Sequence, residues 1–172
     1  MLRGYVALVL LSAPAAAADF RTLDLGDACG SVQVREKALG SVAIPWPHWA
    51  GADIYAFTGR DFDRALTFTY FCTNGRLYSG AYYFPVETLD DAFKTYRAVY
   101  ESLRFTYGDP SVEDAPWQTG PNSNPLAMPA ENRAYTTAWK TPRLDVNMGL
   151  ASNYPSERPG RRVVVGITQR KN

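Results

Sequence analysis

The sequence contains few of the residues that most often perform catalysis or bind metal ions. Among its 172 residues there are one histidine, His48, and two cysteines, Cys29 and Cys72. A structural zinc site takes four such ligands, and a catalytic histidine or cysteine needs a partner group, so these residues predict neither kind of site. The sequence also has no G-x-S-x-G segment, phosphate-binding glycine loop, dinucleotide fingerprint or haem motif. We therefore expect no metal and no cofactor, and we favour a protein that is not an enzyme.

An excess of charge of one sign is also missing. The chain has 18 lysines and arginines against 17 aspartates and glutamates. Proteins that bind nucleic acid through charge present a strong positive excess on one face. The balance predicts that nucleic acid is not a partner of this protein.

Long apolar runs are missing except near the start of the chain. The apolar run 5–11 follows Arg3 and leads to three alanines, a pattern typical of a signal peptide that is cleaved before Asp19. The run is far shorter than the roughly 20 residues that cross a bilayer. The sequence therefore predicts a cleaved signal peptide over 1–18, no membrane span, and a soluble bacterial protein that is periplasmic or secreted.

The two cysteines are most simply explained by a disulfide bond. Export places the chain in an oxidising compartment, where a pair of cysteines is expected to be joined. We therefore predict a bond between Cys29 and Cys72. In the chain-entropy description, closing a loop of this length stabilises the fold by about 4 kcal/mol.

The composition of the remaining chain indicates one globular domain. Hydrophobic residues make up 46% and charged residues 20% of the sequence, which excludes a disordered chain. The range 19–172 has the length of one ordinary domain. Five prolines between positions 109 and 133 predict a Pro-rich loop inside that domain.

Two helices are predicted from capping residues and apolar spacing. Asp27 is a candidate cap for a first helix that runs to about Leu39. Thr88 is a candidate cap for a second helix, in which apolar residues recur every three or four positions as far as Tyr107. Gly108 follows it as a typical C-terminal stop.

Extended segments surround these helices. The range 42–44 is a short extended piece, and apolar alternation or continuous apolar runs predict strands at 54–58, 65–72, 77–84, 135–140, 143–150 and 163–168. The last of these is continuously apolar, which indicates a central strand. We expect a two-layer α+β fold: a mostly antiparallel sheet of about six strands with two helices packed on one face.

A hairpin at Asn74-Gly75 allows the faces of the sheet to be assigned. A two-residue type I′ loop pairs Cys72 with Leu77. In a regular ladder, one face then carries Leu66, Phe68, Tyr70, Ser79, Ala81 and Tyr83 and packs on the helices. The other face carries three aromatic residues that, with two tryptophans of the segment 45–49, form a candidate binding surface: Phe71, Tyr78, Tyr82, Trp46 and Trp49. The alternative is that the Pro-rich loop covers these rings, or that they are scattered exposed aromatics.

The residues that end both expected helices form a recognisable set. Glu36 and Leu39-Gly40 end the first helix, and Leu103 with Tyr107-Gly108-x-Pro110 ends the second. Together with the order of the elements, they resemble a class of small exported bacterial proteins of unknown function. The resemblance covers most of the mature chain. It implies a fold but no activity, because the matched residues are packing and capping residues.

Two short strand segments carry a narrower resemblance. Tyr70-Phe71-Cys72 has the form Tyr-x-Cys, and Ser79-Gly80-Ala81-Tyr82-Tyr83 contains Ser-Gly-x-x-Tyr. Both are similar to motifs of periplasmic lysozyme inhibitors, an all-β family whose inhibitory motif lies in a loop near the end of the chain. Here the second motif is in mid-strand and precedes a long helix, which departs from that family.

The sequence is therefore compatible with three functions. The one we favour is a non-enzymatic binding or accessory protein of the cell envelope, with a protein or another envelope component as its partner. The first alternative is a periplasmic lysozyme inhibitor that uses Ser79 to Tyr83. The second is a hydrolase built around His48.

Overall fold

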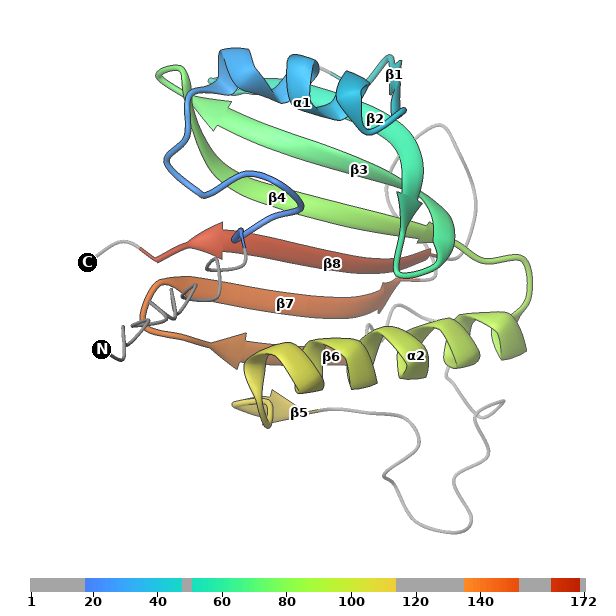
Figure 1. Cartoon of the computed structure of the whole chain (residues 1–172). Coiled ribbons are helices and arrows are strands. Elements are labelled where there is room, and N and C mark those ends of the chain that lie inside the picture. Colours follow the sequence, from blue (N-terminus) through green and yellow to red (C-terminus); the bar gives the residue numbers. More distant parts are fainter. Residues whose placement is uncertain (1–17, 48–50, 114–134, 152–161, 171–172) are drawn as a thin grey trace, which may run out of the picture.

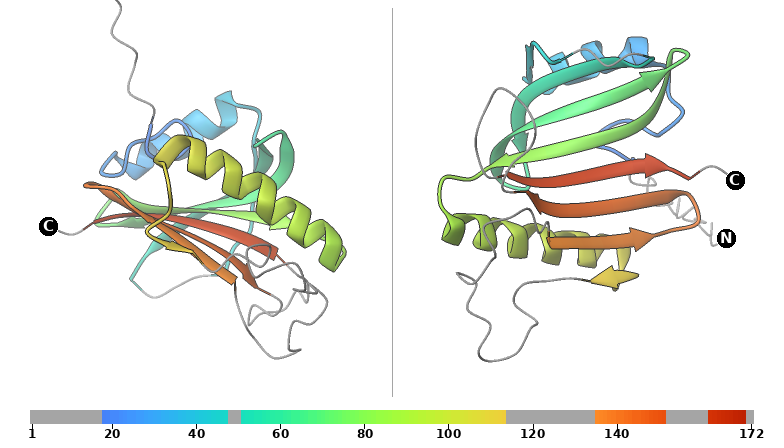
Figure 2. Two further views of the ribbon diagram at one scale, coloured as in Figure 1. Left: turned by 90° about the horizontal axis from the view of Figure 1, so that it is seen from below. Right: turned by 180° about the vertical axis from the view of Figure 1, so that it is seen from behind.

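The computed structural model describes residues 18–47, 51–113, 135–151 and 162–170. Eight strands form one antiparallel sheet in the order β1-β2-β3-β4-β8-β7-β6-β5 (Figure 1). Both helices lie on the same side of this sheet, as the view from below shows (Figure 2, left). The elements are η1 (Cys29–Ser31), α1 (Val32–Ala38), α2 (Leu89–Tyr107), β1 (Val42–Ile44), β2 (Asp53–Asp61), β3 (Arg64–Thr73), β4 (Arg76–Pro85), β5 (Val112–Glu113), β6 (Tyr135–Lys140), β7 (Leu144–Ala151) and β8 (Arg162–Gln169).

The predicted α+β class, antiparallel sheet and pair of helices are confirmed, but the sheet has eight strands instead of about six. The difference comes from the two edges. Strand β1 has three residues and β5 has two, and each is defined by its pairing with a longer neighbour. A strand so short has no periodicity of its own, so the number of strands at an edge depends on tertiary pairing.

Helix α2 has the ends that its sequence predicts. The side chain of Thr88 accepts a hydrogen bond of 3.1 Å from the backbone N–H of Asp91, which satisfies one of the free donors at the start of the helix. Gly108 ends the helix at φ +80°, a conformation that favours glycine. The apolar stripe of α2 is buried against the sheet through Ala92, Tyr96, Val99, Tyr100 and Leu103.

The first helix is shorter than predicted. Instead of starting at Asp27, the chain makes the short 3-10 turn η1 and then the seven-residue helix α1. The reason is tertiary: the N–H of Cys29 donates to the carbonyl of Gly75, and the N–H of Leu77 donates to the carbonyl of Asp27. The backbone before Cys29 therefore pairs with the β3–β4 turn and cannot be helical.

The hairpin turn is confirmed, but the register beyond it is not the predicted one. Asn74 and Gly75 both have positive φ, 52° and 70°, as a type I′ turn requires, and Cys72 pairs with Leu77. The ladder then has a β-bulge, because Phe71 pairs with Ser79 and not with Tyr78. One extra residue in β4 moves every later side chain to the opposite face.

This shift overturns the predicted faces of β4. Gly80, Tyr82 and Phe84 lie on the helix side, whereas Ser79, Ala81 and Tyr83 lie on the opposite side. The close approach of Phe20 to β4 explains why the glycine belongs on the helix side. A Cβ atom at Gly80 would lie 2.4 Å from the ring of Phe20, so no larger residue fits there.

The predicted disulfide is confirmed. Cys29 and Cys72 are bonded, both side chains are buried, and their Cα atoms are 6.3 Å apart. The bond joins η1 to β3, so it fixes the segment before α1 on the sheet. In the described part of the chain, no helix is both long and apolar enough to cross a bilayer.

The order of the elements occurs twice along the chain. Helix α1 is followed by the meander β1–β4, and helix α2 is followed by the meander β5–β8. The two meanders join through the antiparallel pair β4 and β8 at the centre of the sheet (Figure 1). The continuously apolar strand β8 is therefore central, as predicted. We call the two parts the first half and the second half.

Candidate functional site

The face of the sheet opposite the helices holds only part of the predicted aromatic surface. Phe71 and Tyr78 lie on that side near the hairpin turn, with their ring centres 6.4 Å apart. Tyr82 does not, because the bulge places it on the helix side, where it is 4% exposed and packs against Phe20 and Phe62. Its predicted place on the outer face was therefore wrong.

The segment between β1 and β2 contributes one of its two tryptophans to the described structure. The ring of Trp46 packs on Tyr83, with 5.1 Å between the ring centres. Trp49 and His48 lie outside the described residues, as does the range 114–134. The alternative in which the Pro-rich loop covers the aromatic rings therefore also falls outside them.

In the first half, the middle of the outer face is buried. Tyr83, Ala81 and Ala56 are each less than 9% exposed, and Thr69 is fully buried. These side chains come from β2, β3 and β4 and lie on the side away from both helices. Phe71 and Tyr78 therefore lie beside this buried patch, nearer to the Asn74-Gly75 turn.

One row of residues crosses the sheet at that end, from the first half to the second. Consecutive register partners on β2, β3, β4, β8, β7 and β6 form the row. Its members, with the bulge residue Tyr78 beside them, are all at least partly exposed. We call this row the outer strip: Ile54, Phe71, Tyr78, Ser79, Thr168, Asp145 and Lys140.

The chemistry of the outer strip changes along its length. Phe71 and Tyr78 make one end aromatic, and Tyr78 is 36% exposed. In the middle, the hydroxyl groups of Ser79 and Thr168 are 2.9 Å apart, and Ser79 also donates to the carbonyl of Ile167. The other end carries both signs of charge.

The charged end of the strip is formed by the second half. Lys140 lies opposite Asp145 in the β6–β7 ladder, and the guanidinium of Arg170 lies 3.6 Å from the Asp145 carboxylate. Within the described residues, no three histidine, cysteine, aspartate or glutamate side chains gather in a way that would hold a metal ion. The strip therefore offers contact surface and charge.

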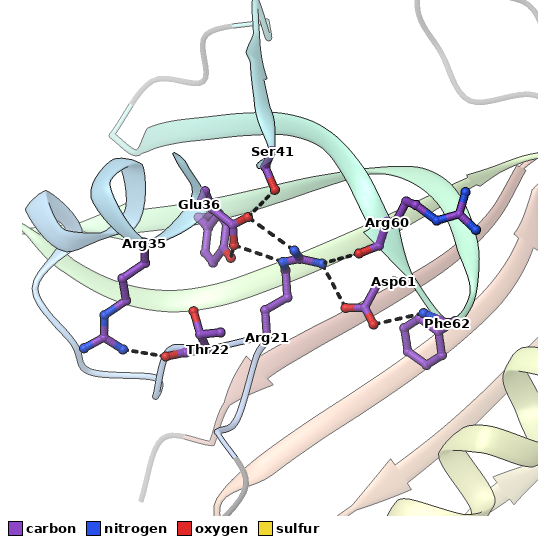
Figure 3. Close-up of polar contacts among 9 residues, drawn as sticks. Arg21, Thr22, Arg35, Glu36, Ser41, Arg60, Asp61 and Phe62 are labelled. Carbon is purple, nitrogen blue, oxygen red and sulfur yellow. Dashed lines mark hydrogen bonds and ion pairs between the residues drawn. The ribbon is translucent and has the colours of Figure 1, made fainter. Parts of the chain in front are cut away.

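A buried ionic cluster lies on the helix side of the first half (Figure 3). Arg21 donates from Nε to Glu36 Oε1 at 2.9 Å and from Nη2 to Glu36 Oε2 at 3.3 Å. The side chains are 6% and 0% exposed. A paired geometry of this kind is needed to offset the cost of removing two charges from water.

Two neutral hydroxyl groups complete the shell of the Glu36 carboxylate. Ser41 donates to Oε2 at 2.7 Å, and the phenol of Tyr70 donates to Oε1. Burial, and then the hydrogen bond and charge of Glu36, raise the pKa of the Tyr70 phenol far above its usual value. Glu36 thus accepts four hydrogen bonds from the chain itself, which identifies it as a structural residue and leaves it no free oxygen for a ligand.

The guanidinium of Arg21 has further partners on β2 and β3. Its Nη1 donates to Asp61 Oδ2 at 2.9 Å, and its central carbon lies 4.0 Å from the centre of the Phe68 ring. Burial alone lowers the pKa of Arg21, but the hydrogen bond and charge of Glu36 outweigh it, and the pKa is raised. Burial, and next the charge of Asp61, raise the pKa of Tyr82 well above its usual value.

Sequence reasoning missed this cluster. Glu36 was singled out only as a helix-end residue, although it lies four positions after the buried Val32 and therefore on the buried side of α1. A charged residue on that side was the one available signal. Of its partners, Ser41 is five positions away, but Arg21 and Tyr70 are 15 and 34 positions away, and no local pattern connects Glu36 to these two.

Comparisons with family models, with curated proteins and with solved structures return no match for this chain.

Proposed function

We propose that this protein is an exported, non-enzymatic binding protein that contacts a protein partner through the outer strip. The observation that carries the proposal is the composition of that strip. It joins an aromatic pair, Phe71 and Tyr78, to a charged end with Lys140 and Asp145, on the face that no described helix covers.

A protein partner accounts for both ends of the strip. Rigid aromatic side chains bury a large area at a low cost in side-chain entropy, so they are common at the centres of protein interfaces. Charges of both signs set the orientation of a partner and disfavour one whose charges do not match. We therefore expect a partner that offers an apolar contact to Phe71 and Tyr78 and charged groups to Lys140 and Asp145.

The two alternatives have less support. Inhibition of lysozyme through Ser79 to Tyr83 requires both ends of that segment to be available, yet Tyr83 is 8% exposed and the hydroxyl of Ser79 is bonded to β8. A hydrolase around His48 depends on a residue outside the described ones. We predict that His48→Ala leaves function unchanged, and a hydrolytic activity lost in that variant would contradict this.

The test uses the mature protein as bait in a periplasmic extract, with bound proteins quantified by mass spectrometry. We expect one protein whose recovery falls by about 30-fold for Tyr78→Ala, since a residue of this kind contributes about 2 kcal/mol to binding. Lys140→Ala should reduce recovery at low salt and make the remaining recovery less dependent on salt, because one salt-screened charge contact is lost.

The matched control is Phe105→Ala, because Phe105 is an aromatic residue of α2 that is 94% exposed and lies off the strip. This variant should recover the partner as well as the wild type does. Equal recovery by all variants would refute the role of the strip, and a loss confined to Phe105→Ala would move the interface to α2. Inhibition of lysozyme by the purified protein would favour the alternative function.

A further inference from the structure

The residues directly after the predicted signal-peptide cleavage site belong to the core of the fold. Phe20 and Leu23 are 1% and 0% exposed, and Leu25 is 5% exposed. Phe20 and Leu23 exchange backbone hydrogen bonds of 2.9 and 3.0 Å, which close a tight turn under α1. We call residues 19–25 the N-terminal strap. No spacer separates the predicted cleavage site from this packed segment.

Asp19 connects the strap to the second half of the molecule. Its Oδ2 atom accepts a hydrogen bond of 3.1 Å from the N–H of Leu25 and one of 3.0 Å from Nη2 of Arg143, which directly precedes β7. The Asp19 side chain is 9% exposed, although the Arg143 side chain is largely exposed. The first residue after the predicted cut is thus held in one position by two partners.

The backbone nitrogen of Asp19 also has a partner. It lies 3.3 Å from Oδ1 of Asp24, to which it donates. We propose that the Ala18–Asp19 bond is a processing site and that the α-ammonium group released at Asp19 forms an ion pair with the carboxylate of Asp24. The proposal rests on the export of the protein, which is part of the proposed function, and it extends it to a specific group created by maturation.

The chemistry of the step is peptide hydrolysis by a signal peptidase. One water molecule is consumed, the C–N bond between Ala18 and Asp19 breaks, a carboxylate remains on Ala18, and the new amine of Asp19 takes up a proton. In the precursor this nitrogen carries a neutral N–H. In the mature chain it carries a charge, and a charge-assisted hydrogen bond is about twice as strong as a neutral one.

The surrounding charges favour a positive group at this position. The carboxylates of Asp19 and Asp24 lie within the strap, and Asp27 accepts a hydrogen bond from the N–H of Asp24. The positive charges that face this group of three come from Arg143 and from Arg35, which is 3.8 Å from Asp27. The phenol of Tyr107 on α2 also faces Asp19, whose charge adds to burial in raising the pKa of that phenol.

The first test identifies the processing site. The chain is expressed with its own leader in a bacterial host, and the intact mass of the periplasmic protein is measured. We expect a protein that begins at Asp19. A different first residue, or a protein that keeps its leader, would overturn the proposal.

The second test isolates the ion pair in purified protein. Fusion cleavage produces two forms, one beginning at Asp19 and one with a single serine in front of it, and each is combined with Asp24→Asn. The added serine should lower the Tm of the Asp24 form by about 1–3 °C, as expected for an ion pair at the surface, and should have no effect in the Asp24→Asn form. High salt should remove the difference.

Asp90→Asn on α2 is the matched control, because Asp90 is an exposed acidic residue that pairs with Lys94 and lies far along the chain from the strap. The added serine should lower the Tm of this variant by as much as it lowers the Tm of the wild type. Equal costs in all three backgrounds would refute the ion pair. Neither test uses a binding partner, so the ion-pair proposal stands even if the outer strip binds nothing. If the ion pair is refuted, binding through the outer strip can still be measured.

Discussion

The two halves of the molecule have the same order of elements but are held together in different ways. In the second half, the 19-residue helix α2 covers the sheet with five buried apolar side chains. In the first half, the seven-residue helix α1 buries only Val32 and Glu36. The remaining cover comes from the N-terminal strap, the disulfide at Cys29 and the ion pair of Arg21 with Glu36.

The difference shows what a long helix provides. Four or five turns of amphipathic helix present a continuous apolar stripe, and its burial stabilises the helix and the sheet together. A helix of two turns presents too few apolar groups for this. The first half therefore depends on a covalent bond and a desolvated charge pair, which are specific contacts that single substitutions can remove.

The largest effect is expected from breaking the charge pair. Arg21→Ala leaves the buried Glu36 carboxylate without its counter-ion, and we expect the free energy of unfolding to fall by about 3–5 kcal/mol. Urea denaturation measures the change. Replacing both residues, Arg21→Met with Glu36→Leu, should cost less than the single substitution, because the fully buried carboxylate is removed too and the Asp61 carboxylate that remains is 35% exposed. Lys94→Ala, which breaks an exposed pair in the second half, should change little; a similar loss in both halves would contradict the comparison.

The next largest effect is expected from removing the disulfide. The change of Cys29 and Cys72 to alanine should lower the free energy of unfolding by about 2–4 kcal/mol. Native-state hydrogen exchange should show where the loss falls. We expect faster exchange in η1, α1 and the Asn74-Gly75 turn, and little change in α2. Uniformly faster exchange in both halves would mean that the bond does not act on the first half alone.

Alkaline pH should separate the halves through their tyrosines. Tyr70 and Tyr82 in the first half have pKa values raised well above the ordinary 10, so above pH 10 the unfolded chain loses protons that the folded chain keeps. The contribution of these phenols to the free energy of unfolding is fully present below that pH. Above it, the free energy of unfolding falls by about 1.4 kcal/mol per pH unit for each such tyrosine. In the second half, burial and Glu113 raise the pKa of Tyr100 to about 12, so its contribution to the fall ends near that pH.

The measurement is urea denaturation between pH 9 and 11, and it is repeated on Tyr70→Phe and Tyr82→Phe. Each substitution should make the fall with pH less steep, whatever it does to stability at neutral pH. The slope, and not the absolute stability, is the readout. An unchanged slope in the variant with both substitutions would show that these two phenols do not control the alkaline limit.

The smallest of the expected effects concerns a buried polar link between α2 and β6. The hydroxyls of Tyr96 and Thr137 are 2.8 Å apart, and both side chains are buried. Tyr96→Phe should cost about 1 kcal/mol, because it leaves the Thr137 hydroxyl without its partner. Adding Thr137→Val to this variant should recover part of that loss. Thermal unfolding of the wild type, the two single variants and the double variant measures the effect. Simply additive costs would contradict the pairing.

The sequence alone predicted the elements whose signals are local. The cap at Thr88, the stripe of α2 and the stop at Gly108 all lie within 21 residues, and each is a property of neighbouring side chains and backbone. The Asn74-Gly75 turn is equally local, since its two positive φ angles follow from the residues themselves. The disulfide was predictable because only two cysteines are available.

Only the tertiary structure decided where β4 places its side chains and how α1 is attached. The bulge at Tyr78 moves Tyr82 from the outer face to the core, and nothing in the alternation of β4 reports it, because aromatic residues lie at 82, 83 and 84 on both faces. The ionic cluster joins Arg21 to partners on α1 and β2 that are distant in the sequence. Neighbouring residues determine turns and helix ends. The partners of a buried charge come from distant parts of the sequence, so only the tertiary fold brings them together.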